Sequence, residues 1–238
     1  MSFNNISFIL HKPQLSENIG LCARAMKNFG FKNLSVIEPK PIFPNDKIIA
    51  TSVGAKDIIK NTKVYLNLER SLINTDILVA TSARFRNKNI KHISLDELAQ
   101  INLTKKVSFL FGSEASGLTN EEISYADYTL QIPSNIKFRS LNLSHSLVIV
   151  AQAVSYLISI NKVNFQKSKK IQSATKKEIS NMLKFCLSAL EKQNFFKQKA
   201  KKPIMIENLR SIFYKMELSQ KEIRILSSVF AGLTKKNL

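Results

Sequence analysis

The sequence predicts an α/β fold with a mostly parallel β-sheet, followed by a small helical extension. Over roughly the first 160 residues, short apolar runs typical of strands alternate with helical segments, the order found in parallel βαβ units. From about residue 173 onward, apolar residues recur at helical spacing. We therefore expect a sheet domain over 1–160, a polar, lysine-rich linker over 161–172 and a helical extension over 173–238.

Each expected strand is a short apolar run that stops at a polar loop. The strands are expected over residues 6–10, 34–37, 64–66, 77–80, 106–111 and 128–132. Helices are expected over residues 18–29, 46–51, 55–60 and 67–74. A long helix should follow Asn142, and because it is apolar on more than one side we expect it in the core or in a subunit contact.

The first helix carries signals at both ends. Ser16 is the expected N-cap, Glu17 is favourable in the first turn, and Gly30 should end the helix at the C′ position. Asn18 lies in the first turn beside free backbone N–H groups, where a ligand or a neighbouring loop can be held. Arg24 lies at the edge of the apolar stripe, and its pattern alone fits a surface arginine better than a functional one.

Three helices are expected in the extension. The capping boxes Thr175 to Glu178 and Ser219 to Glu222 should open the first and the third, and Pro203 precedes the second. Helices this short need the apolar faces of one another, or of the sheet domain, to be stable.

The charge of the chain predicts binding to nucleic acid. The 36 Lys and Arg residues against 17 Asp and Glu residues give a net charge of +19 and a pI near 10.0. A lysine-rich composition that only keeps the protein soluble would spread this charge evenly. Instead, residues 162–238 hold 18 Lys or Arg and 5 Asp or Glu, so most of the net charge lies in the last third.

Cysteine usage and hydropathy favour a cytoplasmic protein. Cys22 and Cys186 lie in apolar helical patterns and cannot build a disulfide framework or a cysteine-rich zinc site. The N-terminus lacks the features of a signal peptide, and no apolar run reaches transmembrane length. We therefore expect no membrane contact.

Two polar loops that follow apolar strands are the strongest signs of a site. The loop over 112–119 carries Glu114, and the loop over 132–144 carries Ser140 and Asn142. Ligands of α/β sheets bind outside the carboxyl ends of the strands, so these two loops should share a ligand.

Common catalytic motifs are absent from both loops. The chain has no G-x-x-x-x-G-K-[ST] phosphate loop, no G-x-G-x-x-G after a strand and no G-x-S-x-G elbow. His11, His92 and His145 have neither the spacing nor the carboxylate neighbours of a metal site, so no metal is expected. The remaining glycines, hydroxyls, amides, carboxylate and arginine suit an adenosine-like cofactor and a charged RNA group better than hydrolysis.

Three stretches resemble the motifs of the SpoU/TrmH class of SPOUT RNA 2′-O-methyltransferases. They are Asn18-Ile19-Gly20-x-x-x-Arg24-Ala25-Met26-Lys27-Asn28-Phe29-Gly30, Phe111-Gly112-x-Glu114-x-x-Gly117-Leu118-Thr119, and Ile132-Pro133 followed by Ser140-Leu141-Asn142-Leu143-Ser144. They occur in the family's order within residues 6–160. Thr81-Ser82-Ala83-Arg84 and the tail over about 170–235 are similar to the TrmJ branch, which methylates the ribose of nucleotide 32 in the tRNA anticodon loop.

The resemblance implies a SPOUT-type sheet with a C-terminal trefoil knot, a homodimer, S-adenosyl-L-methionine as cofactor and tRNA as substrate. It implies that Thr81, Ser82, Ala83, Gly112, Ile132, Arg139, Ser140 and Leu141 hold the cofactor. It also implies that Arg24, supplied by the partner subunit, approaches the target ribose, with Asn18, Glu114, Ser140 and Asn142 completing the site. Because guanidinium keeps its proton at neutral pH, Arg24 should bind phosphate and stabilise developing charge rather than act as the base.

Two alternatives stay open at this point. One is methylation of ribosomal RNA or of another tRNA position. The other is an RNA-binding protein that keeps the fold without the activity, against which the intact motif residues argue. The loop also departs from the family, since Ile136-Lys137-Phe138-Arg139 replaces small and acidic residues and makes it more basic.

Overall fold

The computed structural model describes residues 3–83, 90–160 and 173–235. Within these ranges a sheet of seven parallel strands has the order β3-β2-β1-β6-β4-β7-β5. The strands are β1 Ile6–His11, β2 Asn33–Ile37, β3 Lys63–Tyr65, β4 Ile77–Thr81, β5 Lys91–Ser94, β6 Val107–Phe111 and β7 Tyr128–Gln131. The predicted α/β class and all six predicted strands are confirmed.

The short edge strand β5 was not expected from the sequence. Its segment Lys91-His92-Ile93-Ser94 has a single apolar residue, and in the described sheet it pairs with β7 alone. A polar strand at a sheet edge is formed by its pairing partner more than by its own propensity. Its sequence therefore gives little local signal.

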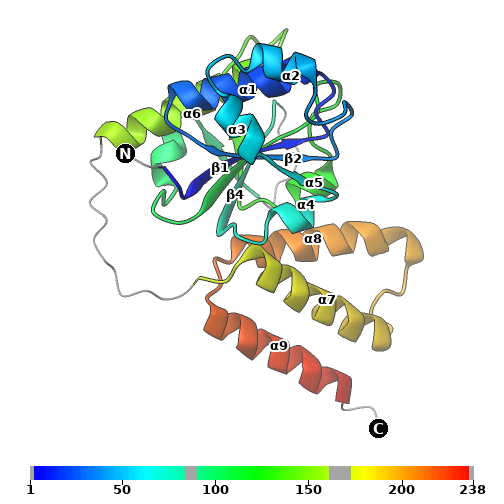
Figure 1. Cartoon of the computed structure of the whole chain (residues 1–238). Helices are drawn as coiled ribbons and strands as arrows, with labels where there is room; N and C mark the ends of the chain where they lie inside the picture. The colour runs from blue at the N-terminus through cyan, green and yellow to red at the C-terminus, as the bar shows by residue number, and fades with distance from the viewer. Residues whose placement is uncertain (1–2, 84–89, 161–172, 236–238) are drawn as a thin grey trace.

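Helices lie on both faces of the sheet (Figure 1). Those that precede residue 161 are α1 Ser16–Asn28, α2 Asp46–Thr51, α3 Lys56–Asn61, α4 Leu68–Ser71, α5 Asn120–Ile123 and α6 Leu143–Ile160, with a 3-10 turn η1 at Asp96–Gln100. Those after residue 172 are α7 Lys176–Lys192, η2 Lys199–Lys201, α8 Lys202–Lys215 and α9 Gln220–Lys235. The helices expected in each region are confirmed, with ends shifted by a few residues.

Two apolar cores follow from the alternation of side chains along the strands. On one face, Phe8 and Phe109 pack with Ile19 of α1 and Leu147 of α6. On the other face, Ile9 and the neighbouring strand residues pack with α4, α5 and the helices of the extension. The extension therefore completes the second core and is not a separate globule.

The first helix begins differently from the prediction. Its N-cap is Leu15, which makes no side-chain cap, and Ser16 is the first helical residue. The hydroxyl of Ser16 instead accepts a hydrogen bond from Asn45 Nδ2 at 2.8 Å, a tertiary contact that competes with capping. The expected end is confirmed, because Gly30 follows the C-cap Phe29 with a φ of 80°.

The long helix α6 is buried on one side. Leu143, Leu147, Val150 and Val154 lie in the core, as expected, whereas Val148 and Tyr156 on its other side are exposed. The expected subunit contact stays a prediction, and so does the knot. No helix among the described residues is long and apolar enough to cross a membrane.

Both capping boxes of the extension are confirmed. Thr175 and Glu178 bond reciprocally at the start of α7, and Ser219 and Glu222 do so before α9. The predicted linker over 161–172 lies outside the described residues, so the domain boundaries stay a prediction. Both cysteines are buried and free, and burial raises the pKa of each thiol.

Candidate active site

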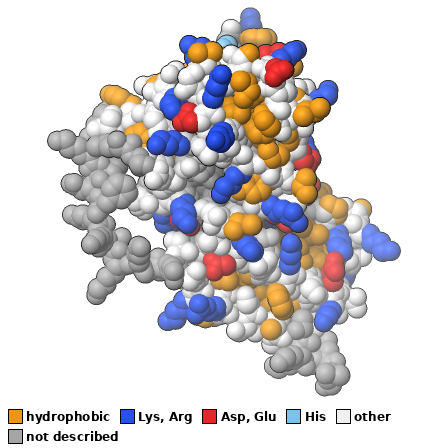
Figure 2. Space-filling model, viewed as in Figure 1, with side chains coloured by type: hydrophobic (Ala, Val, Ile, Leu, Met, Phe, Trp, Pro, Cys, Tyr) orange, Lys and Arg blue, Asp and Glu red, His pale blue; other side chains and the backbone are white. Residues whose placement is uncertain are grey.

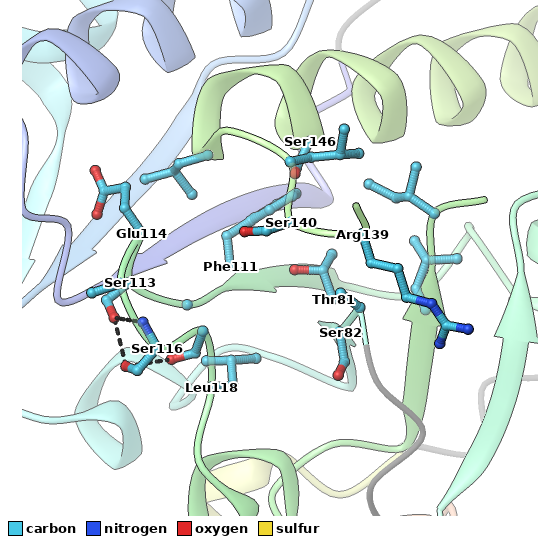
Figure 3. Close-up of a pocket in the computed structure, with 18 of the residues that line it drawn as sticks. Thr81, Ser82, Phe111, Ser113, Glu114, Ser116, Leu118, Arg139, Ser140 and Ser146 are labelled. Atoms are coloured by element: carbon cyan, nitrogen blue, oxygen red, sulfur yellow. Dashed lines mark hydrogen bonds between the residues drawn. The ribbon is translucent and has the colours of Figure 1, made fainter. Parts of the chain in front are cut away.

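Three neighbouring strands end at one cavity. β6, β4 and β7 are adjacent and parallel, so the loops that leave their carboxyl ends lie at the same edge of the sheet. A cavity of about 490 Å³ opens between these loops (Figure 3). It is lined by Thr81, Ser82, Ala83, Phe111, Gly112, Ser113, Glu114, Ala115, Ser116, Gly117, Leu118, Leu130, Ile132, Ile136, Lys137, Phe138, Arg139, Ser140, Leu141, Leu143 and Ser146.

All eight residues expected to hold a cofactor line this cavity. The strand exits are tied to one another, since Thr81 Oγ1 donates to the Leu110 carbonyl at 3.0 Å and the Ser82 N–H donates to the Leu130 carbonyl at 3.0 Å. Figure 3 shows Thr81, Ser82 and Ser140 around the same open space, with Arg139 at its side. Ser140 and Arg139 are both exposed, so they are available to a ligand.

The glycine loop forms a compact wall of the cavity. A Cβ placed on Gly112 would overlap the backbone of Gly117 and Leu118, so only glycine fits there. Gly117 has a φ of 67°, which also favours glycine, and a β-bridge joins it to Ser113. The two loop arms approach closely, and both Gly112 and Gly117 line the cavity.

A chain of hydrogen bonds joins the three motifs beside the cavity. Asn18 Nδ2 donates to Glu114 Oε1 at 2.7 Å, and Asn142 Nδ2 donates to Asn18 Oδ1 at 3.0 Å. Glu114 Oε2 also accepts the Gln14 N–H at 2.8 Å. The structure thus brings Asn18, Glu114 and Asn142 together, with each polar group bonded to another part of the protein.

Asn142 also begins α6. Its Oδ1 accepts the Ser144 N–H at 2.8 Å and the Ser144 hydroxyl at 2.7 Å, so the side chain caps the helix. One amide therefore fixes both the start of α6 and the position of Asn18 on α1. Such bonding suits a positioning role better than direct contact with a reacting atom.

Arg24 lies apart from this cluster. It is exposed on α1, does not line the cavity of its own chain, and has no hydrogen bond or ion pair with another described residue. Asn18 and Asn142 do not line the cavity either, but hydrogen bonds join them to Glu114, which does. Among the expected site residues, Arg24 alone is in neither the cavity lining nor this chain of hydrogen bonds.

A buried histidine lies close to the cavity wall. His11 ends β1, whose neighbour β6 leads into the glycine loop, and its Nδ1 is 3.2 Å from Glu122 Oε1. Burial lowers the pKa of His11 most, and the charge of Glu122 opposes that shift. The neutral imidazole can donate Nδ1–H to this carboxylate. No group of residues in the described ranges has the composition of a metal site.

Several lining residues were not among the site residues expected from the sequence. Ser146 is one turn into α6 beyond Asn142, and its helical i, i+4 spacing from that residue was a usable signal. Ser113 and Ser116 bond to each other through their hydroxyls at 2.9 Å. Ile136 and Phe138 are 78% and 76% exposed, so the basic loop also presents apolar surface at the cavity.

Comparison with known proteins agrees with this geometry. Residues 5–152 match the SpoU rRNA Methylase family model. The chain is 31% identical, over 97% of its length and 91% of the relative, to tRNA (cytidine/uridine-2′-O-)-methyltransferase TrmJ of Sodalis glossinidius.

Solved structures have the same fold. The crystal structure of TrmJ from Z. mobilis ZM4 superimposes with a TM-score of 0.85 at 27% identity, covering 95% of this chain and 98% of that one. AviRb of Streptomyces viridochromogenes, solved in complex with the cofactor AdoMet, superimposes with a TM-score of 0.50 at 20% identity, covering 63% of this chain and 56% of that one. The latter shows a shared fold alone.

Proposed function

The chain belongs to the SpoU rRNA Methylase family, and we propose that it transfers a methyl group from S-adenosyl-L-methionine to a ribose 2′-OH of tRNA. The observation that carries this proposal is the cavity beside which hydrogen bonds join the three motifs, combined with similarity to TrmJ along nearly the whole chain. Nucleotide 32 of the anticodon loop is the proposed target, as the resemblance to the TrmJ branch implies. A tRNA substrate also favours a cytoplasmic location.

The cavity residues fit the proposed cofactor. A volume of about 490 Å³ lies within the range of small-molecule sites. The close approach at Gly112 presents backbone groups that an adenosine can pair with, and Leu130, Ile132 and Leu141 offer apolar surface for its ring. When bound, the cofactor supplies an activated methyl on a sulfonium and needs no metal.

The protein's task is then alignment. The glycine loop and the loop after β7 form two walls of the cavity, and the Glu114–Asn18–Asn142 chain fixes both walls to α1. Rigid walls hold the 2′-oxygen in line with the transferred group, which accounts for much of the rate in a reaction between two bound partners. The exposed hydroxyl of Ser140 lies inside the cavity, where it can hydrogen-bond to the ribose.

We propose that Arg24 binds the RNA, and that it does so at the active site of the partner subunit. Its guanidinium binds the phosphate beside the target ribose and stabilises developing negative charge. The absence of Arg24 from its own cavity supports a homodimer in which the partner supplies it. The exposed apolar side chains Leu21 of α1 and Val148 and Tyr156 of α6 provide surface for that contact.

Incubation with labelled cofactor and total RNA tests the proposal. The expected result is label on tRNA, mapped to the 2′-oxygen of nucleotide 32. Label on ribosomal RNA alone would show that the substrate is ribosomal RNA, as the family's name describes, and not tRNA. No label on any RNA, with cofactor bound, would instead support a binding protein without activity.

A further inference from the structure

The connection between α7 and α8 combines exposed aromatic and basic side chains. Phe195 is 50% exposed, and its ring lies 5.4 Å from that of Phe196 in an edge-to-face arrangement. Lys197, Lys199 and Lys201 are exposed and have no ion pair with another described residue. Figure 2 shows Lys and Arg side chains beside hydrophobic ones at this end of the extension.

One cation of the cluster is already neutralised and serves to shape it. Lys202 Nζ bonds to Glu191 Oε1 at 2.6 Å and lies 5.5 Å from the centre of the Phe196 ring. This holds Phe196 against the start of α8 and leaves Phe195 facing outward. Exposing a phenyl ring among unpaired lysines to water alone is unfavourable. The same side chains are well suited to bind an anionic partner that has flat apolar rings.

The connection lies toward the edge of the sheet at which the strands have their carboxyl ends, and the cavity opens at that same edge. α7 starts at the amino edge of the sheet, where the Lys176 N–H donates to the Thr75 carbonyl just before β4. α8 returns to that edge, where Glu217 pairs with Lys105 just before β6. Half-way along α7, Lys184 reaches Glu69 of α4, so the last eight residues of α7 extend about 12 Å further toward the carboxyl ends of the strands.

We propose that this connection, residues 193–202, binds unpaired RNA, with Phe195 stacked on a base and Lys197, Lys199 and Lys201 on the adjoining phosphates. The inference rests on the proposed function and deepens it, because it assigns the single-stranded part of the substrate to one segment of the extension. Stacking on aromatic rings requires a base that is not paired, whereas lysine contacts to phosphate do not. The segment therefore distinguishes a looped RNA from a duplex.

Binding measurements on full-length variants test this. The RNAs are an anticodon stem-loop and a duplex of the same stem. Phe195→Ala should weaken stem-loop binding by about 5- to 150-fold and leave duplex binding nearly unchanged, while Phe195→Tyr keeps the stack and the affinity. Phe185→Ala is the matched control, since it removes a phenyl of α7 that is 60% exposed but lies outside the connection.

Charge is tested separately. Changing Lys197, Lys199 and Lys201 together to Gln should lower the slope of log affinity against log salt by about 2 for the stem-loop. The RNA methylation rate of the wild type is measured in parallel. The inference would be overturned if Phe195→Ala bound the stem-loop as tightly as the wild type. If the wild type still labelled tRNA, the proposed function would stand.

Two other outcomes also decide the matter. Equal loss of stem-loop and duplex binding in Phe195→Ala would overturn base stacking. If Phe195→Ala changed the sedimentation of the dimer and left RNA binding unchanged, Phe195 would contact another copy of the chain. That result would overturn the inference. A wild type that neither binds nor methylates RNA would overturn both proposals.

Discussion

The Nζ of Lys176 and the Oδ2 of Asp127 lie 2.5 Å apart in a pair whose side chains are 1% and 5% exposed. Lys176 is the first residue of α7, and Asp127 precedes β7. The carboxylate also accepts the Leu78 N–H at 2.7 Å, and Lys176 Nζ also donates to the Tyr214 carbonyl. Burial lowers the pKa of Lys176 and raises that of Asp127, and the charge of each opposes the shift of the other. The pair joins the extension to the sheet.

Replacing Lys176 with Met should lower the free energy of unfolding by about 3–5 kcal/mol. The change leaves Asp127 buried without its cation, a situation that costs far more than the net stabilisation of an intact pair. Urea denaturation followed by circular dichroism measures the loss. Lys176→Met combined with Asp127→Asn should recover part of it, because the amide oxygen can still accept the Leu78 N–H.

The matched control is Lys184→Met. This lysine of the same helix pairs with Glu69, but the two side chains are 65% and 39% exposed, so its removal should cost at most about 1 kcal/mol. If both variants lost the same small amount, the buried pair would not be what holds the extension in place.

Asn142 has two roles that substitution can separate. Asn142→Ala removes the cap of α6 and the bond to Asn18, and should cost about 1–2 kcal/mol together with most activity. Asn142→Asp keeps an acceptor for the Ser144 N–H but loses the donor to Asn18. It should therefore keep most of the stability and still lose activity. Full activity in Asn142→Asp would show that the chain of hydrogen bonds is not needed for positioning.

Arg24→Lys should reduce kcat/KM for tRNA methylation by about 100-fold, because an ammonium cannot reproduce the forked contact of a guanidinium with phosphate. Stability should change by less than about 0.5 kcal/mol, since the side chain is exposed and has no partner in the described ranges. Arg70→Lys on α4, also exposed, is the control and should methylate like the wild type.

Mixed dimers test which chain supplies Arg24. Arg24→Lys subunits, which lose most of their methylation rate, are combined with Gly112→Ala subunits, which bind the cofactor weakly. If Arg24 acts across the interface, the mixed dimer has one site with both residues intact and regains activity. Absence of recovery in a stable mixed dimer would place Arg24 in its own subunit's site.

The sequence was a good guide to the sheet because buried strands carry their own signal. The central strands β1, β4 and β6 are mostly apolar runs and were located within a residue or so. β5 was not found, because its side chains are polar and its pairing with β7 is set by the rest of the fold. The prediction that Ser16 caps the first helix was wrong because of another tertiary contact. The Ser16 hydroxyl accepts a hydrogen bond from Asn45 Nδ2 and does not cap the helix.

The candidate site divides in the same way. Loops at strand ends could be read from the sequence, and the eight expected cofactor residues line one cavity. The hydrogen bonds of Asn18 to Glu114 and to Asn142 could not, because each joins residues about a hundred positions apart. The role of Gly20 was also hidden: a Cβ there would overlap Thr51 and the Ile48 carbonyl, so its place in the first motif reflects the close packing of α1 on α2.

Gly112→Ala should destabilise the protein by about 1–3 kcal/mol and weaken cofactor binding. The added methyl overlaps backbone atoms of the same loop, and a change of side-chain rotamer cannot relieve that overlap. Calorimetric titration with S-adenosyl-L-methionine and urea denaturation give the two values. Gly232→Ala is the opposite case. Its Cβ meets nothing within 4 Å in helix α9, so alanine should stabilise the protein by about 0.5–1 kcal/mol. Destabilisation of equal size in both variants would contradict the packing argument at Gly112.

The buried His11 predicts a loss of stability on mild acidification. Burial holds its pKa below the ordinary value of 6.5, so the unfolded chain binds the proton more readily than the folded one. The stabilisation is fully present above pH 6.5 and is lost as the pH falls through the folded pKa. The free energy of unfolding of the wild type should therefore fall relative to His11→Gln between about pH 7.5 and about pH 5, as followed by urea denaturation.

His145→Gln provides the control for His11, because it removes an imidazole that is exposed on α6. Its stability curve should run parallel to that of the wild type over the same range. A wild type that gained stability relative to His11→Gln on acidification would mean that the ion pair with Glu122, 3.2 Å away, outweighs burial and raises the folded pKa. That sign would reverse the assignment of His11 as a neutral donor to Glu122 beside the glycine loop.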